Sequence, residues 1–189
     1  MRRLLPVVTA ALVLLVGCSA DDDPEPRIAP TDSSSAASTT APPPSPTGPV
    51  EPTLPAEAAG EDAAAAEAFV RYFWAAVNHA QATGDVRTLQ TLGTDTCAAC
   101  AGGVESIEKT YLAGGTMDGG AITVDALKSE PYESGPSRGF LVTADTTAES
   151  QKVTVPGKKG KTYPGGQSTI RLIVERSDGR WQVARMDPI

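Results

Sequence analysis

The hydrophobic pattern of this chain changes its period once, near residue 121, and this change limits the fold more than any other feature. Between residues 61 and 113 the apolar side chains recur at the spacing of one helix face. From Ala121 onward they alternate with polar residues, which is typical of strands that bury one face. Helices followed by strands predict an α+β domain in which N-terminal helices pack on an antiparallel sheet.

The first helix is predicted between Glu61 and Thr83. Glu61 and Asp62 carry negative charge at its start, where the helix dipole favours acidic side chains, and Gly84 is a residue type that commonly ends a helix. One face is apolar and consists of Ala66, Phe69, Val70, Phe73, Val77 and Ala80. This stripe predicts that the helix packs against the rest of the domain.

Two further helices are expected before the sheet. The first covers residues 85–92, with Asp85 as its cap and with Leu89 and Leu92 as its buried contacts. The second follows Thr94, Asp95 and Thr96, which offer caps, and ends at Gly114-Gly115. Its apolar positions are Cys97, Cys100, Val104, Ile107 and Tyr111.

Strands are expected at residues 121–126, 140–145, 153–155, 169–176 and 181–186. In the first of them, Ile122, Val124 and Ala126 alternate with polar residues and should face the core. Asp178-Gly179 lies between two apolar runs, and this dipeptide is a strong signal for a tight hairpin. The second half therefore predicts a meandering antiparallel sheet.

The N-terminus has the features of an export signal. Arg2 and Arg3 precede an apolar run, residues 4–16, that is short for a membrane span. The run ends in Gly17-Cys18, which resembles the bacterial lipobox, where the cysteine is acylated on sulfur and becomes the mature N-terminus. An ordinary secretory signal and an uncleaved anchor are the alternatives. The lipobox reading predicts a signal peptide at 1–17 and stable attachment to the membrane.

Residues 18–56 differ from the rest of the chain in composition. They hold ten of its sixteen prolines, many Ser and Thr residues, and almost no large apolar side chain. Ordering such a segment buries too little to offset the entropy of the chain, so we expect a disordered tether there. The folded domain is then expected at residues 57–189. Its mildly acidic charge argues against a nucleic-acid partner, which requires concentrated basic surface.

The order of these motifs resembles a known superfamily. A long first helix, Gly84-Asp85, Leu89 with Leu92, and a final hairpin around Asp178 are similar to the NTF2-like, cone-shaped α+β fold. Cys97, Cys100 and Tyr111 add a narrower similarity to an uncharacterised actinobacterial lipoprotein domain, over about residues 60–188. The resemblance implies a curved sheet around the helices and a pocket at the open end of the cone. It implies no single activity.

Cys97 and Cys100 form a C-x-x-C pair at the start of the third predicted helix. A helix start can lower the pKa of a thiol, as in thioredoxin-type redox sites, but no βαβ context surrounds this pair. Both cysteines lie on the apolar stripe, and an exported protein meets oxidising conditions. We therefore expect a structural disulfide, ahead of redox activity and of metal binding. No metal and no cofactor are expected.

The aromatic residues Tyr72, Trp74, Tyr111 and Trp181 are candidates to line a pocket, although such residues more often fill a core. Catalytic candidates are weak. His79 is the one histidine, and on the helical wheel it lies away from the apolar stripe, near Tyr72. In the alternative hypothesis, a cone-pocket isomerase, dehydratase or hydrolase acting on a small molecule, Tyr72, His79 or Asp187 would supply proton transfer.

The leading hypothesis is a non-catalytic binding module, held on the extracytoplasmic face of the cell membrane by its N-terminal lipid. Its partner would be a small apolar ligand or an envelope protein. A homodimer, in which the partner is a second copy of the chain, is a further alternative. Lys158, Lys159 and Lys161 form the one basic concentration, on a predicted loop. A solvated loop tip is the default interpretation, and contact with an anionic envelope polymer or a lipid headgroup is the minor one.

Overall fold

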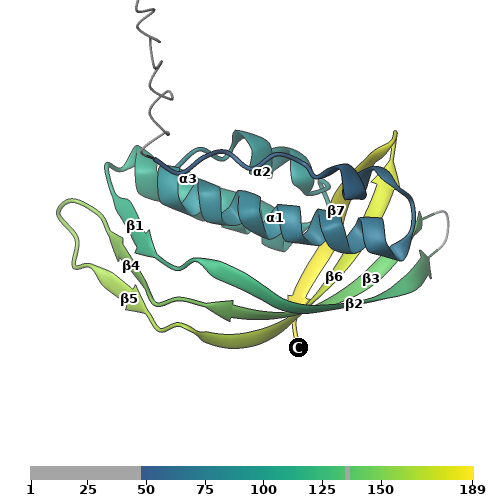
Figure 1. The fold of residues 1–189 in the computed structure, drawn as a ribbon. Coiled ribbons are helices and arrows are strands. Elements are labelled where there is room, and N and C mark those ends of the chain that lie inside the picture. The colour runs from purple at the N-terminus through teal and green to yellow at the C-terminus, as the bar shows by residue number, and fades with distance from the viewer. Residues whose placement is uncertain (1–47, 135–136) are drawn as a thin grey trace, which may run out of the picture. The chain divides into compact units, whose positions relative to one another are not determined.

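The computed structural model describes residues 48–134 and 137–189. The expectations for the signal peptide, for Cys18 and for most of the tether therefore lie outside the described residues. The helices are a 3-10 turn η1 at Ala56–Ala59, α1 at Ala63–Thr83, α2 at Arg87–Leu92 and α3 at Ala98–Leu112. The strands are β1 at Thr116–Gly119, β2 at Ile122–Ser134, β3 at Ser137–Ala148, β4 at Gln151–Thr154, β5 at Lys161–Tyr163, β6 at Gly166–Ser177 and β7 at Arg180–Pro188. The order confirms an α+β domain, with helices followed by antiparallel strands (Figure 1).

The ends of α1 follow from local chemistry. The Asp62 carboxylate accepts a hydrogen bond from the Ala65 amide at 2.9 Å and caps the first turn. Gly84 ends the helix with φ of 78°, a left-handed conformation that glycine adopts without strain. A side chain at Gly84 would also collide with the Tyr111 ring, which would lie 2.5 Å from its Cβ. The predicted stop of the first helix is confirmed.

The caps of the next two helices differ from the expectation. The residue at the cap of α2 is Val86, and Asp85 stands one position earlier, where its carboxylate accepts the Arg87 amide at 3.1 Å. Leu89 and Leu92 are buried as predicted. The cap of α3 is Cys97, within the predicted helix range.

The strands form two hydrogen-bonded sheets, and the chain passes directly from one sheet to the other three times. The larger has the order β2-β3-β6-β7 and the smaller the order β1-β4-β5, and all their pairings are antiparallel. The chain passes from β1 to β2, from β3 to β4 and from β5 to β6 through short irregular breaks. A Cβ at Gly119, the last residue of β1, would stand 2.3 Å from the Ser150 carbonyl oxygen, so glycine permits the close approach there. The sequence pattern missed β1 and β5 because they are short and mostly exposed, which leaves no apolar alternation.

The expectation that Ala126 faces the core was wrong. The register of β2 against β3 shifts between Val124 and Ala126, which is a β-bulge. After the bulge Ala126 is exposed, and Leu127 takes the partly buried position. The hairpin at Asp178-Gly179 is confirmed: both residues have positive φ, and Ser177 pairs with Arg180.

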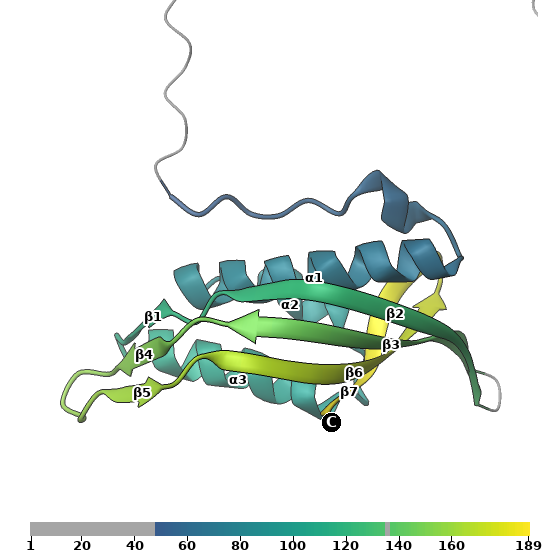
Figure 2. The same cartoon turned by 60° about the horizontal axis from the view of Figure 1, so that its bottom comes forward.

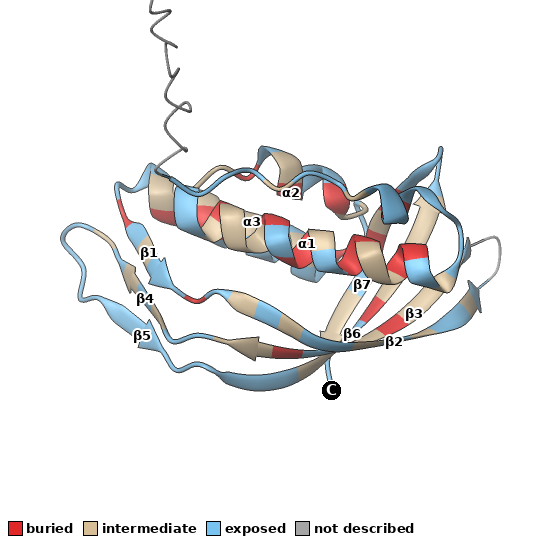
Figure 3. Ribbon diagram, in the orientation of Figure 1, coloured by how far each residue is buried: buried red, intermediate tan, exposed pale blue. Residues whose placement is uncertain are grey.

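The core lies between α1 and the inner face of the larger sheet (Figures 1 and 2). Buried residues gather along α1 and on β3, β6 and β7 (Figure 3). α2 packs against α1 and β7, and α3 packs against α2 and β7. The large side chains with less than 2% exposure are Phe69, Phe73, Leu172, Val70, Val142, Val174 and Val183.

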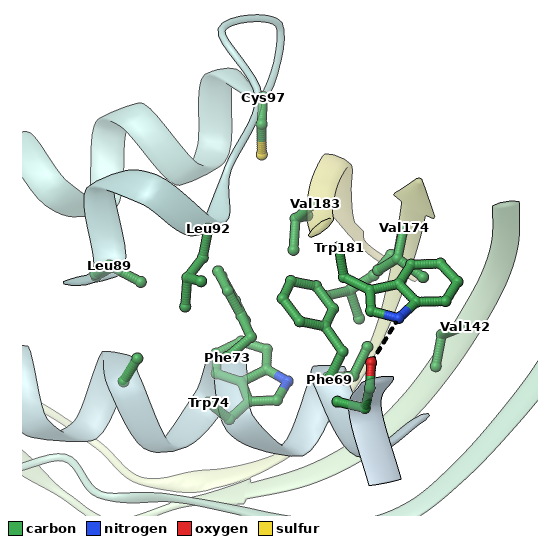
Figure 4. Packing of buried hydrophobic residues seen from close by; sticks show 14 of the residues in the cluster. Phe69, Phe73, Trp74, Leu89, Leu92, Cys97, Val142, Val174, Trp181 and Val183 are labelled. Carbon is green, nitrogen blue, oxygen red and sulfur yellow. Dashed lines mark hydrogen bonds between the residues drawn. The ribbon is translucent and has the colours of Figure 1, made fainter. Parts of the chain in front are cut away.

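The described chain before α1 packs on the domain. Residues 48–55 run in extended form along α1 to η1, and the Thr88 hydroxyl of α2 donates to the Glu51 carboxylate (Figure 2). The Trp181 indole donates to the carbonyls of Ala58 at 3.0 Å and Gly60 at 3.2 Å. Figure 4 shows the indole donating one hydrogen bond to a backbone carbonyl. The packed region therefore begins before residue 57, the boundary that composition predicted, because the segment uses the surface of α1 in place of a core of its own.

Among the described helices, none has the length and the apolar character that crossing a membrane requires.

Candidate functional site

The space between α1 and the sheet is filled with side chains, as Figure 4 shows. Phe69 and Phe73 of α1 are 1% exposed and meet Val142, Val174 and Val183 of the sheet, all fully buried. The pocket that the cone-shaped resemblance implies is not found at this place. The hollows of the described domain lie at its surface.

The most apolar of these hollows is a groove on the outer side of α1, which we call the α1 groove. It has a volume of about 570 Å³ and lies between the extended segment and the helix. Its lining residues are Pro52, Thr53, Pro55, Glu57, Ala64, Glu67, Ala68, Arg71, Tyr72 and Ala75. Small alanine side chains on one wall and proline rings on the other leave an open apolar channel with few polar atoms.

Tyr72 is the one aromatic residue that lines this groove. It is half-buried, and its burial raises the pKa of the phenol, with a smaller contribution from the negative charge of Glu51. The same side chain lines a second hollow of about 300 Å³, next to Leu54 and Trp181. Tyr72 therefore connects two apolar hollows and keeps its proton at neutral pH, so that its hydroxyl can donate a hydrogen bond.

Two charged residues of the groove are held by bonds to β2. The Glu67 carboxylate accepts from the Ser129 hydroxyl at 2.6 Å. The Arg71 guanidinium donates to the Val124 carbonyl at 3.2 Å. Both bonds orient these side chains along the side of α1 that faces β2, so the groove is bordered by polar groups in fixed positions.

The four candidate pocket aromatics do not come together. Tyr72 and Trp181 both line the smaller hollow. Trp74 is 5% exposed and packs edge-on against Phe73, with ring centroids 5.4 Å apart. Tyr111 packs on Gly84, as described above, and its hydroxyl donates to the Gln81 carbonyl at 2.6 Å. Trp74 and Tyr111 therefore have structural roles. They are aromatic like Tyr72 and Trp181, but each packs against different neighbours.

The catalytic candidates are also dispersed. Asp187 lies on β7, and its carboxylate accepts from the Arg185 guanidinium at 2.5 Å. His79 lies near the end of α1, and its buried Nδ1 has no hydrogen-bond partner among the described residues. Neither residue lines the α1 groove or the smaller hollow beside it. Tyr72 therefore has neither His79 nor Asp187 beside it in these hollows as a partner for proton transfer.

Cys97 and Cys100 form the disulfide that the sequence predicted, with an S–S distance of 2.03 Å and Cα atoms 5.2 Å apart. Cys97 is buried, while Cys100 lines a hollow of about 350 Å³ between α2 and α3. Gly93 packs against Cys100, and the next amide, of Thr94, donates to the Val183 carbonyl at 2.9 Å. The disulfide therefore stands where the α2–α3 connection is joined to β7. Within residues 48–134 and 137–189, no cluster of His, Cys, Asp and Glu could hold a metal ion.

The sequence pattern missed most of the groove. Pro52 and Pro55 had the composition of a tether, and the alanines of α1 carried no apolar signal of their own. One signal was present: Ala64, Ala68 and Ala75 recur at helical spacing opposite the phenylalanine stripe. A second stripe of small residues on one helix indicates a second packed face.

These features define a class of protein: an α+β domain with a filled interior and with its apolar hollow on the surface. The chain belongs to the DUF6318 family, a family of unknown function, and residues 36–187 match it. A search of curated proteins gives no match. Among solved structures, the fold is similar to the intermembrane space region of the chloroplast protein ARC6. The TM-score is 0.51 at 18% identity, over 68% of this chain and 96% of that one, a likeness of fold alone.

Proposed function

We propose that this protein is a lipid-anchored lipoprotein on the extracytoplasmic face of the membrane, and that its domain binds an apolar segment of an envelope protein in the α1 groove. In this proposal the domain is an NTF2-like module without catalytic activity. The anchor is the acylated Cys18 that follows Gly17, as the lipobox resemblance implies. The actinobacterial lipoprotein resemblance supports the same location.

The observation that carries the proposal is where the hollow space lies. An enzyme or a small-ligand carrier built on a cone needs an enclosed interior, where solvent is excluded from the bound molecule. Here the interior holds Phe69, Phe73 and the valines of the sheet. The apolar space is instead an open groove on the outer surface of α1. This arrangement favours a binding surface over the cone-pocket enzyme with Tyr72, His79 and Asp187.

The shape of the groove indicates the kind of partner. From Ala64 to Ala75 the helix rises about 16 Å, the length of about five residues of extended chain. The chain's own residues 52–55 already lie against this surface in extended form. A neighbouring extended segment with small apolar side chains would fit the same alanine face, and the Tyr72 hydroxyl and the Arg71 guanidinium could meet its backbone carbonyls.

Two matched variants of α1 test the proposal. Ala75 and Ala82 are both exposed alanines of this helix, but only Ala75 lines the groove. Peptides are selected on the immobilised chain, and their dissociation constants are measured by fluorescence anisotropy. We expect apolar peptides that Ala75→Glu weakens at least about tenfold, since a charge would be desolvated, and that Ala82→Glu leaves unchanged.

Selected peptides that bind wild type and Ala75→Glu equally well would contradict the assignment of the groove. Native mass spectrometry of the chain purified from its own host distinguishes the other occupants. A co-purified small molecule that is lost in Ala75→Glu would replace the protein segment by a small apolar ligand. A dimer lost in the same variant would make a second copy of the chain the partner.

A further inference from the structure

The turn between β4 and β5 carries a concentration of positive charge that the proposed function does not use. Residues 150–164 contain four lysines, Lys152, Lys158, Lys159 and Lys161, and no acidic residue. All four are exposed. None takes part in the ion pairs found among residues 48–134 and 137–189. This concentration stands out in a chain whose net charge is −7.

Exposed apolar groups lie beside these lysines. Leu112, the last residue of α3, is 87% exposed, and Tyr163 of β5 is 43% exposed. The Lys161 ammonium lies 4.3 Å from the centre of the Tyr163 ring. The end of α3 also adjoins the β4–β5 turn, because a Cβ at Gly114 would contact Pro156 at 3.7 Å. We call the surface formed by Leu112, Lys158, Lys159, Lys161 and Tyr163 the basic end. Lys152 pairs with Thr162 and therefore lies on the other face of these strands from Lys161 and Tyr163.

The chain enters the described domain at this same end. The extended segment starts where α1 and α3 stop and runs toward the start of α1, so residue 48 and the β4–β5 turn lie at one end of α1 (Figures 1 and 2). The hydrogen bond between Thr88 and Glu51 holds the beginning of the segment near α2. The chain that leads to Cys18 therefore leaves the domain on the side that carries the lysines.

We propose that the basic end binds the anionic phospholipid headgroups of the membrane in which the chain is anchored. The proposal rests on the lipid anchor of the proposed function. Lysines near an anionic surface raise the binding constant about fivefold each, and tyrosine favours the level of the headgroups. The composition of residues 18–47 predicts a tether, and 30 residues of random coil span roughly 30 Å on average, so even weak contacts would hold the domain against the membrane.

The apolar residues favour a membrane over a soluble or wall-bound polyanion. Binding of a negatively charged polymer would require only the positive charge of the lysines. An exposed leucine and a half-exposed tyrosine on the same surface gain free energy when they leave water for the headgroup region. Lipid binding should therefore depend on Leu112 as well as on the lysines.

Vesicle sedimentation tests the proposal on the chain 18–189 with Cys18→Ser, which keeps the tether and the domain but cannot carry a lipid. The vesicles are phosphatidylcholine alone or mixed with anionic phosphatidylglycerol. We expect binding to the mixed vesicles that falls with salt, and weaker binding by roughly 100-fold when Lys158, Lys159 and Lys161 are changed to Gln. Leu112→Gln should weaken binding severalfold.

The control variant changes Lys128, Arg138 and Arg171 to Gln, which alters the net charge equally on exposed residues away from the basic end. Equal loss of binding in this control, or equal binding of wild type to both vesicle compositions, would overturn the proposal. Loss with the lysine variant but none with Leu112→Gln would overturn the preference for a membrane over a polyanion, because charge alone would then account for the binding. Because this chain has no lipid and its groove is intact, each of these results leaves the peptide test of the α1 groove unaffected.

Discussion

Gly93 shows how much a single position can depend on its surroundings. Its backbone is extended, with φ of −103°, so glycine is not required there by conformation. It is required by space, since a Cβ at this position would stand 2.8 Å from the Cβ of Cys100. The residue lies where the α2–α3 connection meets both the disulfide and β7.

We therefore expect Gly93→Ala to lower the free energy of unfolding by about 1–3 kcal/mol, because the disulfide would have to move. Gly103→Ala is the control. Gly103 lies inside α3 with open space around it, so alanine there should raise stability by about 0.5–1 kcal/mol. Urea denaturation of both variants provides the measurement. Equal effects of the same sign at both positions would contradict the packing argument.

At the scale of elements, the joint between α1 and β2 depends on one side chain. The Asn78 amide donates to the Ile122 carbonyl and accepts from the Ile122 amide, both at 2.8 Å. These two bonds fix the start of β2 against the helix in the way that a neighbouring strand would. Farther along β2, Arg71 and Glu67 bond the same strand.

Asn78→Ala should cost about 1–3 kcal/mol of stability, because it leaves a donor and an acceptor of Ile122 without partners. Asn78→Asp keeps the acceptor for the Ile122 amide and should lie between wild type and alanine. Hydrogen exchange at the Ile122 amide should become faster in Asn78→Ala and stay slow in Asn78→Asp. Unchanged exchange in the alanine variant would show that the bonds do not hold β2.

At the scale of the whole domain, the chain before α1 completes the core. It covers the Trp181 indole, which is 6% exposed and donates to Ala58 and Gly60. Arg176 adds contacts to the same turn by donating to the Ala59 carbonyl at 2.7 Å. The segment is thus part of the folded unit, although its composition is that of a linker.

A chain that starts at residue 61 should be less stable than one that starts at 48 by about 2 kcal/mol or more, because the indole loses its partners and its cover. Tryptophan fluorescence should shift to the red in the shorter chain, since Trp181 becomes exposed. A melting temperature and an emission spectrum identical to those of the longer chain would show that the segment packs without stabilising the domain.

The accuracy of the sequence predictions differed with the range of the interactions. Gly84 and the Asp178-Gly179 turn were predicted correctly, because caps and tight turns depend on a few neighbouring residues. Ala126 was misplaced because a bulge depends on the pairing with β3, which lies farther along the chain. The α1 groove was missed for the same reason: proline and alanine become a binding surface only when two segments lie together.

From the amino-acid sequence alone we predicted the α+β class, the end of α1 at Gly84, the final hairpin and the preference for a Cys97–Cys100 disulfide. Each of these follows from hydrophobic periodicity or from residues within a few positions of one another. The three-dimensional packing was needed to show that the interior is filled, that the apolar hollow lies outside α1, and that the lysines share one end with the incoming chain. These properties depend on which faces of distant segments meet, and packing of the whole domain selects among faces that the local pattern leaves equivalent.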